Sequence, residues 1–170
     1  MSLLHPDLLK NSLIDITLND LHQLGVRGLL LDVDNTLTTH GSQVLDSQIA
    51  AWLEHMKKHN ISLTIVSNGK PSRVAPFAAR LGLRFIAFAC KPLPSGFIRG
   101  ARRLGLPRCQ CAAVGDQTFT DIIGANLAGV RSIQLLPILP ERQLTLRLKR
   151  HFEKYILDRF RKLQEKNNNK

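Results

Sequence analysis

The sequence predicts an α/β fold, a three-layer Rossmann-like parallel sheet of about five strands with helices on both faces and no large cap domain. Short apolar runs alternate with stretches of helical periodicity between residues 25 and 140. Strands and helices in alternation imply right-handed crossovers and a parallel sheet. A chain of 170 residues has the size of one domain, and no linker rich in Gly, Pro or Ser divides it.

The chain divides into three parts. Residues 1–24 form a lead-in that packs on the domain, residues 25–140 form the α/β domain, and residues 141–170 form a basic amphipathic C-terminal helix with a frayed tail. Within the lead-in we expect a short helix over Leu18–Leu24 that begins at Asn19 or Asp20.

The first predicted strand is Gly28–Val33, a continuous apolar run typical of a central parallel strand that is covered on both faces. Four further runs are predicted to be strands: Ile61–Val66, Arg84–Ala89, Cys111–Val114 and Arg131–Leu135.

Helices are predicted between these strands. Asp46 is the expected N-cap of one that runs to about His59, and Ile49, Trp52 and Met56 share its apolar face. The other predicted helices are Pro71–Leu81, Ser95–Leu104 and about Asp121–Leu127, each followed by a glycine.

The formal charge of +11 favours an anionic partner, which could be a substrate, a membrane surface or nucleic acid. Residues 141–170 hold ten Lys and Arg against four Asp and Glu, so we place more than half of the excess there. The three cysteines suit neither a disulfide framework nor a zinc motif. The sequence shows neither a secretory signal nor an apolar run of membrane-spanning length, so we expect a cytoplasmic protein.

Polar side chains follow four of the five predicted strands. Because parallel strands end at one edge of a sheet, residues far apart in the chain should converge on one pocket there. The set comprises Asp32, Asp34 and Thr36, then Ser67 and Asn68, then Lys91, and finally Asp116 and Asp121.

The chemistry of this set is coherent. Three carboxylates in one place repel one another unless a cation lies among them, and hard oxygen ligands suit Mg²⁺. A hydroxyl, a lysine and backbone amides beside the metal would bind phosphoryl oxygens. Taken singly, the residues have plainer interpretations: Asp32-Val33-Asp34 and Ser67-Asn68-Gly69 as turns, Lys91 as a solvated lysine, Asp121 as an N-cap.

The motifs D-x-D-x-T, S-N, K-P and G-D-x-x-x-x-D, in this order, resemble those of the haloacid dehalogenase superfamily of phosphatases over about Leu29 to Leu135. The lead-in from His5-Pro6-Asp7-Leu8 to Gly28 is similar to that of the YqeG-type group of subfamily IIIA. That group is related to phosphatidylglycerophosphate phosphatases.

The resemblance implies a role for each residue. Asp32 would be the nucleophile, Asp34 would protonate the leaving oxygen and then activate water, and Thr36 would support their loop. Asp116 would bind Mg²⁺ with Asp32 and the backbone carbonyl of Asp34, and Asp121 would complete the metal site.

The remaining motif residues would bind the phosphoryl group. Ser67, with the amide of Asn68, would hold its oxygens, and Lys91 would neutralise both this group and the nucleophile. Three residues close to the motif loops could also touch the substrate, although we expect them to be solvated: His40, Lys70 and Arg73.

Members of the superfamily select substrates largely with cap insertions, and both connections that could hold a cap are short here. An open pocket suits a phosphate displayed on something large. Basic residues fill much of the predicted C-terminal helix around its apolar stripe, as in helices that lie on membrane surfaces. A helix that packs this stripe on the domain explains the pattern equally well.

Three hypotheses follow. The first is an Mg²⁺-dependent phosphatase acting on phosphatidylglycerophosphate, peripheral on the inner surface of an anionic membrane. The second is the same chemistry on a soluble nucleotide or sugar phosphate. The third is a non-enzymatic module that binds anionic surfaces; nucleic acid is not expected as its partner, because basic and aromatic residues are not interleaved.

Overall fold

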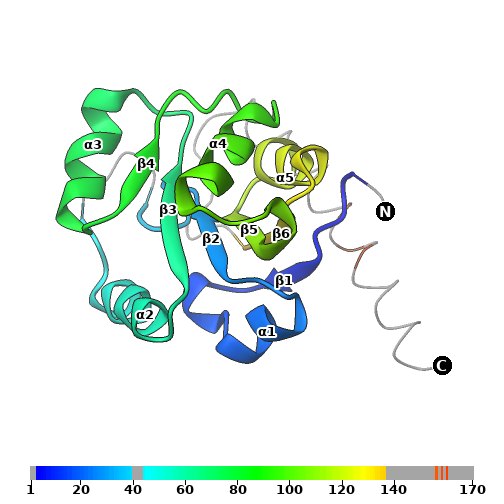
Figure 1. The fold of residues 1–170 in the computed structure, drawn as a ribbon, viewed down its shortest axis with the longest axis horizontal. Coiled ribbons are helices and arrows are strands. Elements are labelled where there is room, and N and C mark those ends of the chain that lie inside the picture. The colour runs from blue at the N-terminus through cyan, green and yellow to red at the C-terminus, as the bar shows by residue number, and fades with distance from the viewer. Residues whose placement is uncertain (1–2, 40–43, 137–155, 157, 159, 161–170) are drawn as a thin grey trace.

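The computed structural model describes residues 3–39 and 44–136, together with Ile156, Asp158 and Phe160. Its centre is a parallel sheet of six strands in the order β1-β6-β5-β2-β3-β4 (Figure 1). The strands are β1 (Leu8–Lys10), β2 (Gly28–Leu31), β3 (Ser62–Val66), β4 (Arg84–Ile86), β5 (Cys111–Gly115) and β6 (Arg131–Leu135).

Helices cover both faces of the sheet, as predicted. They are α1 (Leu18–Gln23), α2 (Ser47–Lys58), α3 (Pro71–Arg80), α4 (Ser95–Leu104) and α5 (Ile123–Ala128). Three single turns complete the described part: η1 (Leu13–Asp15), η2 (Arg108–Gln110) and η3 (Thr118–Ile122), the last of which is π-helical.

Alternate residues of the central strands face two separate cores, because successive side chains of a strand point to opposite sides. Leu29 and Leu31 of β2 pack with α1, α2 and α3 on one face. Leu30 packs with α4 and α5 on the other. Burial on both faces explains why β2 reads as a continuous apolar run.

The sixth strand comes from the lead-in, where no strand was predicted. β1 pairs in parallel with β6, and Leu8 lies opposite Ile133. Asp7 anchors this edge, since its Oδ2 accepts a hydrogen bond of 2.8 Å from the backbone N–H of Ser132. Its Oδ1 lies 3.1 Å from Nη1 of Arg131. A three-residue strand is too short to show a period of two, so the sequence held no clear signal for it.

Several element boundaries differ from the prediction, and two of the differences have a clear local cause. The N-cap of α1 is Thr17, whose Oγ1 accepts a hydrogen bond from the N–H of Asp20. Strand β4 ends at Ile86 instead of Ala89, because Phe88 and Cys90 adopt left-handed backbone conformations that end the strand.

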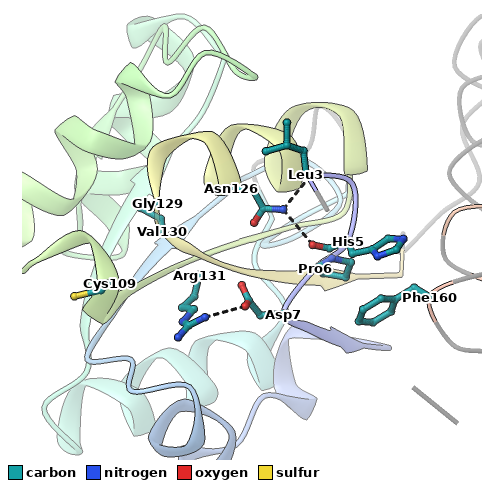
Figure 2. A pocket seen from close by; sticks show the side chains of 10 residues that line it. All are labelled: Leu3, His5, Pro6, Asp7, Cys109, Asn126, Gly129, Val130, Arg131 and Phe160. Carbon is teal, nitrogen blue, oxygen red and sulfur yellow. Dashed lines mark hydrogen bonds and ion pairs between the residues drawn. The ribbon is translucent and has the colours of Figure 1, made fainter. Parts of the chain in front are cut away.

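Most of the predicted C-terminal helix lies outside the described residues. Phe160 is described, and its ring centroid lies 5.5 Å from that of His5. Figure 2 shows both side chains at a pocket of about 520 Å³, which Arg131 also lines. This pocket lies where β6 begins, at the sheet edge opposite the carboxyl ends of the strands. No helix within residues 3–39 or 44–136 is long and apolar enough to cross a membrane.

Candidate active site

The carboxyl edge of the sheet brings together the acidic residues that follow β2 and β5. Carboxylate oxygens of Asp32, Asp116 and Asp121 all lie within 4.8 Å of one another. All three residues are buried. The parallel direction of the strands produces this cluster, since β5 pairs directly with β2.

Lys91 lies inside this carboxylate cluster. Its Nζ donates hydrogen bonds of 2.5 Å to Oδ1 of Asp32 and 2.6 Å to Oδ1 of Asp121. The lysine is buried, with 8% of its surface exposed, so the solvated position considered for it is excluded. The segment that carries it, residues 87–94, connects β4 to α4 and is called the Lys91 loop below.

Asn68 fixes the Lys91 loop against the end of β3. Its Oδ1 accepts a hydrogen bond of 2.7 Å from the backbone N–H of Lys91, and its Nδ2 donates one of 3.1 Å to the carbonyl of Lys91. The side chain of Asn68 therefore positions the lysine. A role of its backbone amide toward a substrate remains a prediction.

The charges of the cluster interact strongly. Burial raises the pKa of Asp32 to about 7; Lys91 opposes this rise, and the carboxylates of Asp121 and Asp116 add to it. Burial lowers the pKa of Lys91, but the Asp121 and Asp32 carboxylates more than offset it, so the pKa lies above its ordinary value. Lys91 is therefore a permanent cation here.

The donor set fits a divalent metal ion. Three carboxylates beside a single ammonium leave an excess of negative charge when all are ionised. Oxygen ligands in such a buried cluster are those that hard cations prefer. Asp32, Asp116 and Asp121 are thus the residues that could hold the metal.

Asp34 lies apart from the cluster, although only Val33 separates it from Asp32. Its carboxylate forms an ion pair with Nη2 of Arg73, and 17% of its side-chain surface is exposed. Asp34 lies in a tight turn that begins at Val33, in which Asn35 has a φ of 55° and the N–H of Leu37 donates to the carbonyl of Val33. Two carboxylates two residues apart thus have different surroundings.

Thr36 and Ser67 are both buried at this edge. The Oγ of Ser67 accepts a hydrogen bond of 3.0 Å from the N–H of Gly69, so Ser67-Asn68-Gly69 is a turn. This turn also borders the site. Thr36 lies in the turn that separates Asp34 from α2. Their roles toward a substrate remain predictions.

Asp121 is not a helix cap, because α5 begins at Ile123 and Asp121 belongs to the π-helical turn η3. Its Oδ2 accepts a hydrogen bond of 3.2 Å from the N–H of Gln117. That bond and the one from Lys91 together fix both carboxylate oxygens.

The close approach of Asp121 to β5 depends on Gly115. A Cβ at position 115 would lie 2.4 Å from Cγ of Asp121. We therefore expect Gly115→Ala to displace Asp121 and to lower metal affinity by about tenfold or more. Isothermal titration with Mg²⁺ measures this. Gly82→Ala is the control for general destabilisation, because its φ of +60° strains an added Cβ although no atom lies within 4 Å of it. Unchanged affinity in Gly115→Ala would show that Asp121 does not support the metal site.

Arg73 is the site residue that the sequence analysis did not select. It was expected to be solvated, but it occupies the first turn of α3 and reaches Asp34. The sequence signal that could have indicated this role was its position: Arg73 lies three residues after Lys70, in a helix that begins at the sheet edge where the other motif residues lie. Lys70 is exposed, and His40 lies outside the described residues.

Comparisons with known proteins agree with this geometry. The family model of haloacid dehalogenase-like hydrolases matches residues 43–129. A model described as mitochondrial PGP phosphatase matches residues 2–76, which include Asp32 and Asp34. The "Probable phosphatase YqeG" of Bacillus subtilis (strain 168) is 35% identical over 152 residues, 89% of this chain and 88% of that protein.

Solved structures share the fold at low identity. An uncharacterized protein from Listeria monocytogenes serotype 4b matches with a TM-score of 0.57 and 21% identity, over 69% of this chain and 85% of that one. The 4-nitrophenylphosphatase of Thermotoga maritima matches with a TM-score of 0.56 and 12% identity, over 72% and 91%. The chain belongs to the haloacid dehalogenase-like hydrolases and is a phosphatase related to the phosphatidylglycerophosphate phosphatases.

Proposed function

We propose that this phosphatase hydrolyses phosphatidylglycerophosphate at a membrane surface, with Mg²⁺ and through an aspartyl-phosphate formed on Asp32. The observation that carries the mechanism is the buried cluster in which Lys91 contacts both Asp32 and Asp121 while Asp34 lies outside it. The match of residues 2–76 to the mitochondrial PGP phosphatase model supports the substrate.

We assign Asp32 to the attack on phosphorus, an assignment that its place in the cluster beside Lys91 supports. Its carboxylate oxygen forms a bond to phosphorus as the bond to the leaving oxygen breaks. Lys91 balances the charge of the incoming phosphoryl group, and the Oγ of Ser67 would donate to one of its oxygens. Bound Mg²⁺ at Asp32, Asp116 and Asp121 would supply further stabilisation of the charge on the phosphoryl oxygens.

Asp34 is assigned the proton transfers. It would donate a proton to the leaving alkoxide, and then take one from the water that cleaves the aspartyl-phosphate and restores Asp32. Its partial exposure and its position outside the carboxylate cluster allow it to meet both the leaving group and solvent. Arg73 would orient its carboxylate between these steps.

This assignment predicts a dependence on the leaving group. Arg73→Met should lower kcat by about tenfold to a hundredfold on glycerol 3-phosphate, because Asp34 loses the partner that orients it. On 4-nitrophenyl phosphate the loss should be much smaller, since 4-nitrophenolate leaves without protonation. Arg73→Lys should recover part of the activity. Equal losses on both esters would contradict a link between Arg73 and proton transfer.

The substrate is tested by phosphate release from phosphatidylglycerophosphate in detergent micelles, beside a panel of soluble nucleotide and sugar phosphates. We expect the value of kcat/KM to be highest for the lipid. A higher value for a soluble ester would reject the lipid as substrate and retain the mechanism.

A further inference from the structure

About half of the domain is strongly basic, although more than half of the net positive charge of the chain lies in residues 141–170. From His55 to Gly115 the sequence holds eleven Lys and Arg and no Asp or Glu. The stretch includes β3, α3, the edge strand β4, the Lys91 loop and α4. Figure 1 shows α3 and α4 in the part of the molecule that holds the edge strand β4, where they cover opposite faces of the sheet. Exposed basic side chains in this stretch, which holds no acidic residue, attract a partner of opposite charge.

The Lys91 loop also exposes two large apolar side chains. Phe88 is 54% exposed and Leu93 is 59% exposed. They flank Lys91, whose Nζ reaches Asp32 and Asp121, so they lie at the edge of the sheet where the substrate enters. They are two of the six exposed large hydrophobic residues in the part of the chain that the structure describes.

The backbone holds Phe88 in its exposed position. Its φ of 44° lies in the left-handed region, which bulky residues rarely adopt. Its N–H donates a hydrogen bond of 3.1 Å to the carbonyl of Gly69, and its carbonyl accepts one of 3.3 Å from Nη2 of Arg99. An unfavourable conformation fixed by its surroundings indicates a functional constraint.

Two basic residues belong to the same contacts or adjoin them. Lys70 follows Gly69 in the chain, and the guanidinium of Arg99 lies against the Phe88 carbonyl. Both residues are exposed. An apolar pair with basic neighbours is the chemistry of elements that bind the interface of an anionic bilayer, where apolar groups enter between the head groups and cations meet lipid phosphates.

We propose that the Lys91 loop docks the phosphatase on an anionic bilayer by inserting Phe88 and Leu93 among the head groups, with Lys70 and Arg99 on lipid phosphates. The proposal rests on the proposed function, and it places the mouth of the active site against the membrane that holds the substrate. The surface is therefore built into the catalytic domain and does not require the C-terminal segment.

Vesicle binding of the full chain tests the proposal. The vesicles contain equal parts of phosphatidylcholine and phosphatidylglycerol, and binding is measured by sedimentation. The double variant Phe88→Asn/Leu93→Gln should bind about tenfold more weakly than the wild type. Asn is chosen at position 88 because it tolerates the left-handed backbone. Hydrolysis of 4-nitrophenyl phosphate should stay within about twofold of wild type, which shows that the variant is folded.

Leu127→Gln is the matched control. Leu127 is 50% exposed on α5, near the opposite edge of the sheet, so vesicle binding should not change. Wild-type binding by the double variant would overturn the proposal, as would equal weakening by Leu127→Gln. Because the proposed surface is basic as well as apolar, the wild type should bind vesicles that contain phosphatidylglycerol more tightly than vesicles of phosphatidylcholine alone. Equal binding of the wild type to both would also overturn the proposal.

A second measurement reports insertion directly. Phe88→Trp introduces an indole into the Lys91 loop, and the single native tryptophan, Trp52, is buried and donates to the carbonyl of Ile16. Brominated lipid should quench the introduced indole, whereas the indole of Leu127→Trp should keep its emission. An unquenched indole at position 88 would overturn insertion.

The two proposals can fail separately. Hydrolysis of phosphatidylglycerophosphate in detergent micelles needs no bilayer, so hydrolysis without vesicle binding rejects the docking surface and keeps the substrate. Vesicle binding through Phe88 and Leu93 without hydrolysis of this lipid rejects the substrate and keeps the surface.

Discussion

Asp32→Asn is expected to abolish turnover, with kcat lowered by about a thousandfold or more, while the protein remains folded and binds substrate. The amide cannot form the acyl-phosphate, and it preserves the size of the side chain beside Lys91. Phosphate release from a soluble ester measures the loss. Rapid acid quenching followed by peptide mass spectrometry should find a phosphoryl group on Asp32 in the wild type and none at position 32 in Asp32→Asn.

Asp34→Asn provides the comparison for this experiment. It should also lose turnover, but it retains the nucleophile, so a phosphoryl group should still be found on Asp32 with a good leaving group. Turnover near that of the wild type in Asp32→Asn would exclude Asp32 as the nucleophile.

Asp32→Asn should also change how the free energy of unfolding depends on pH in the absence of metal. Burial raises the pKa of Asp32 from 3.8 to about 7, so between these values the folded state holds more protons than the unfolded state. The free energy of unfolding therefore falls as pH rises through this range. Urea denaturation in a chelator should show this slope in the wild type, and a smaller slope in Asp32→Asn.

Lys91→Met is the second change with a large expected effect. It removes the ammonium that contacts Asp32 and Asp121, and it leaves these buried carboxylates without that partner. We expect kcat to fall by about a hundredfold to a thousandfold, because the charge of the phosphoryl group is no longer balanced. Without metal, the free energy of unfolding should fall by about 3 kcal/mol.

Added Mg²⁺ should restore much of the stability of Lys91→Met without restoring its activity. The ion can offset the carboxylate charge, but the ammonium beside Asp32 remains absent. Urea denaturation with and without Mg²⁺ separates the two effects, and Lys58→Met, at an exposed position on α2, is the control. Full activity in Lys91→Met would remove the lysine from the mechanism.

The sequence was sufficient to predict the central strands and the convergence of their polar ends. Gly28–Leu31 and Cys111–Gly115 are buried along their whole length and Ser62–Val66 is buried from Leu63 onward, so apolar residues dominate each strand. Parallel direction then follows from the helices between them, and the carboxylates meet at one edge. The helix Ser47–Lys58 was equally clear from its cap at Asp46 and its apolar face.

Other features depend on contacts between distant residues and have no local signal. β1 exists because Asp7 and Arg131 join the lead-in to β6. Arg73 reaches Asp34 only because α3 begins beside the loop that follows β2. Asn68 supports Lys91 across 23 positions of the chain, whereas the sequence suggested a turn there or a contact of the Asn68 amide with phosphate.

The sequence by itself determined the α/β class, the edge of the sheet that carries the chemistry, and the family, because strand periodicity and motif order are local properties. The tertiary structure decided that Lys91 joins the buried carboxylates, that Arg73 pairs with Asp34, and that Phe88 and Leu93 face solvent. These depend on how loops pack after the sheet has formed, and hydrogen bonds such as that between Phe88 and Gly69 determine them.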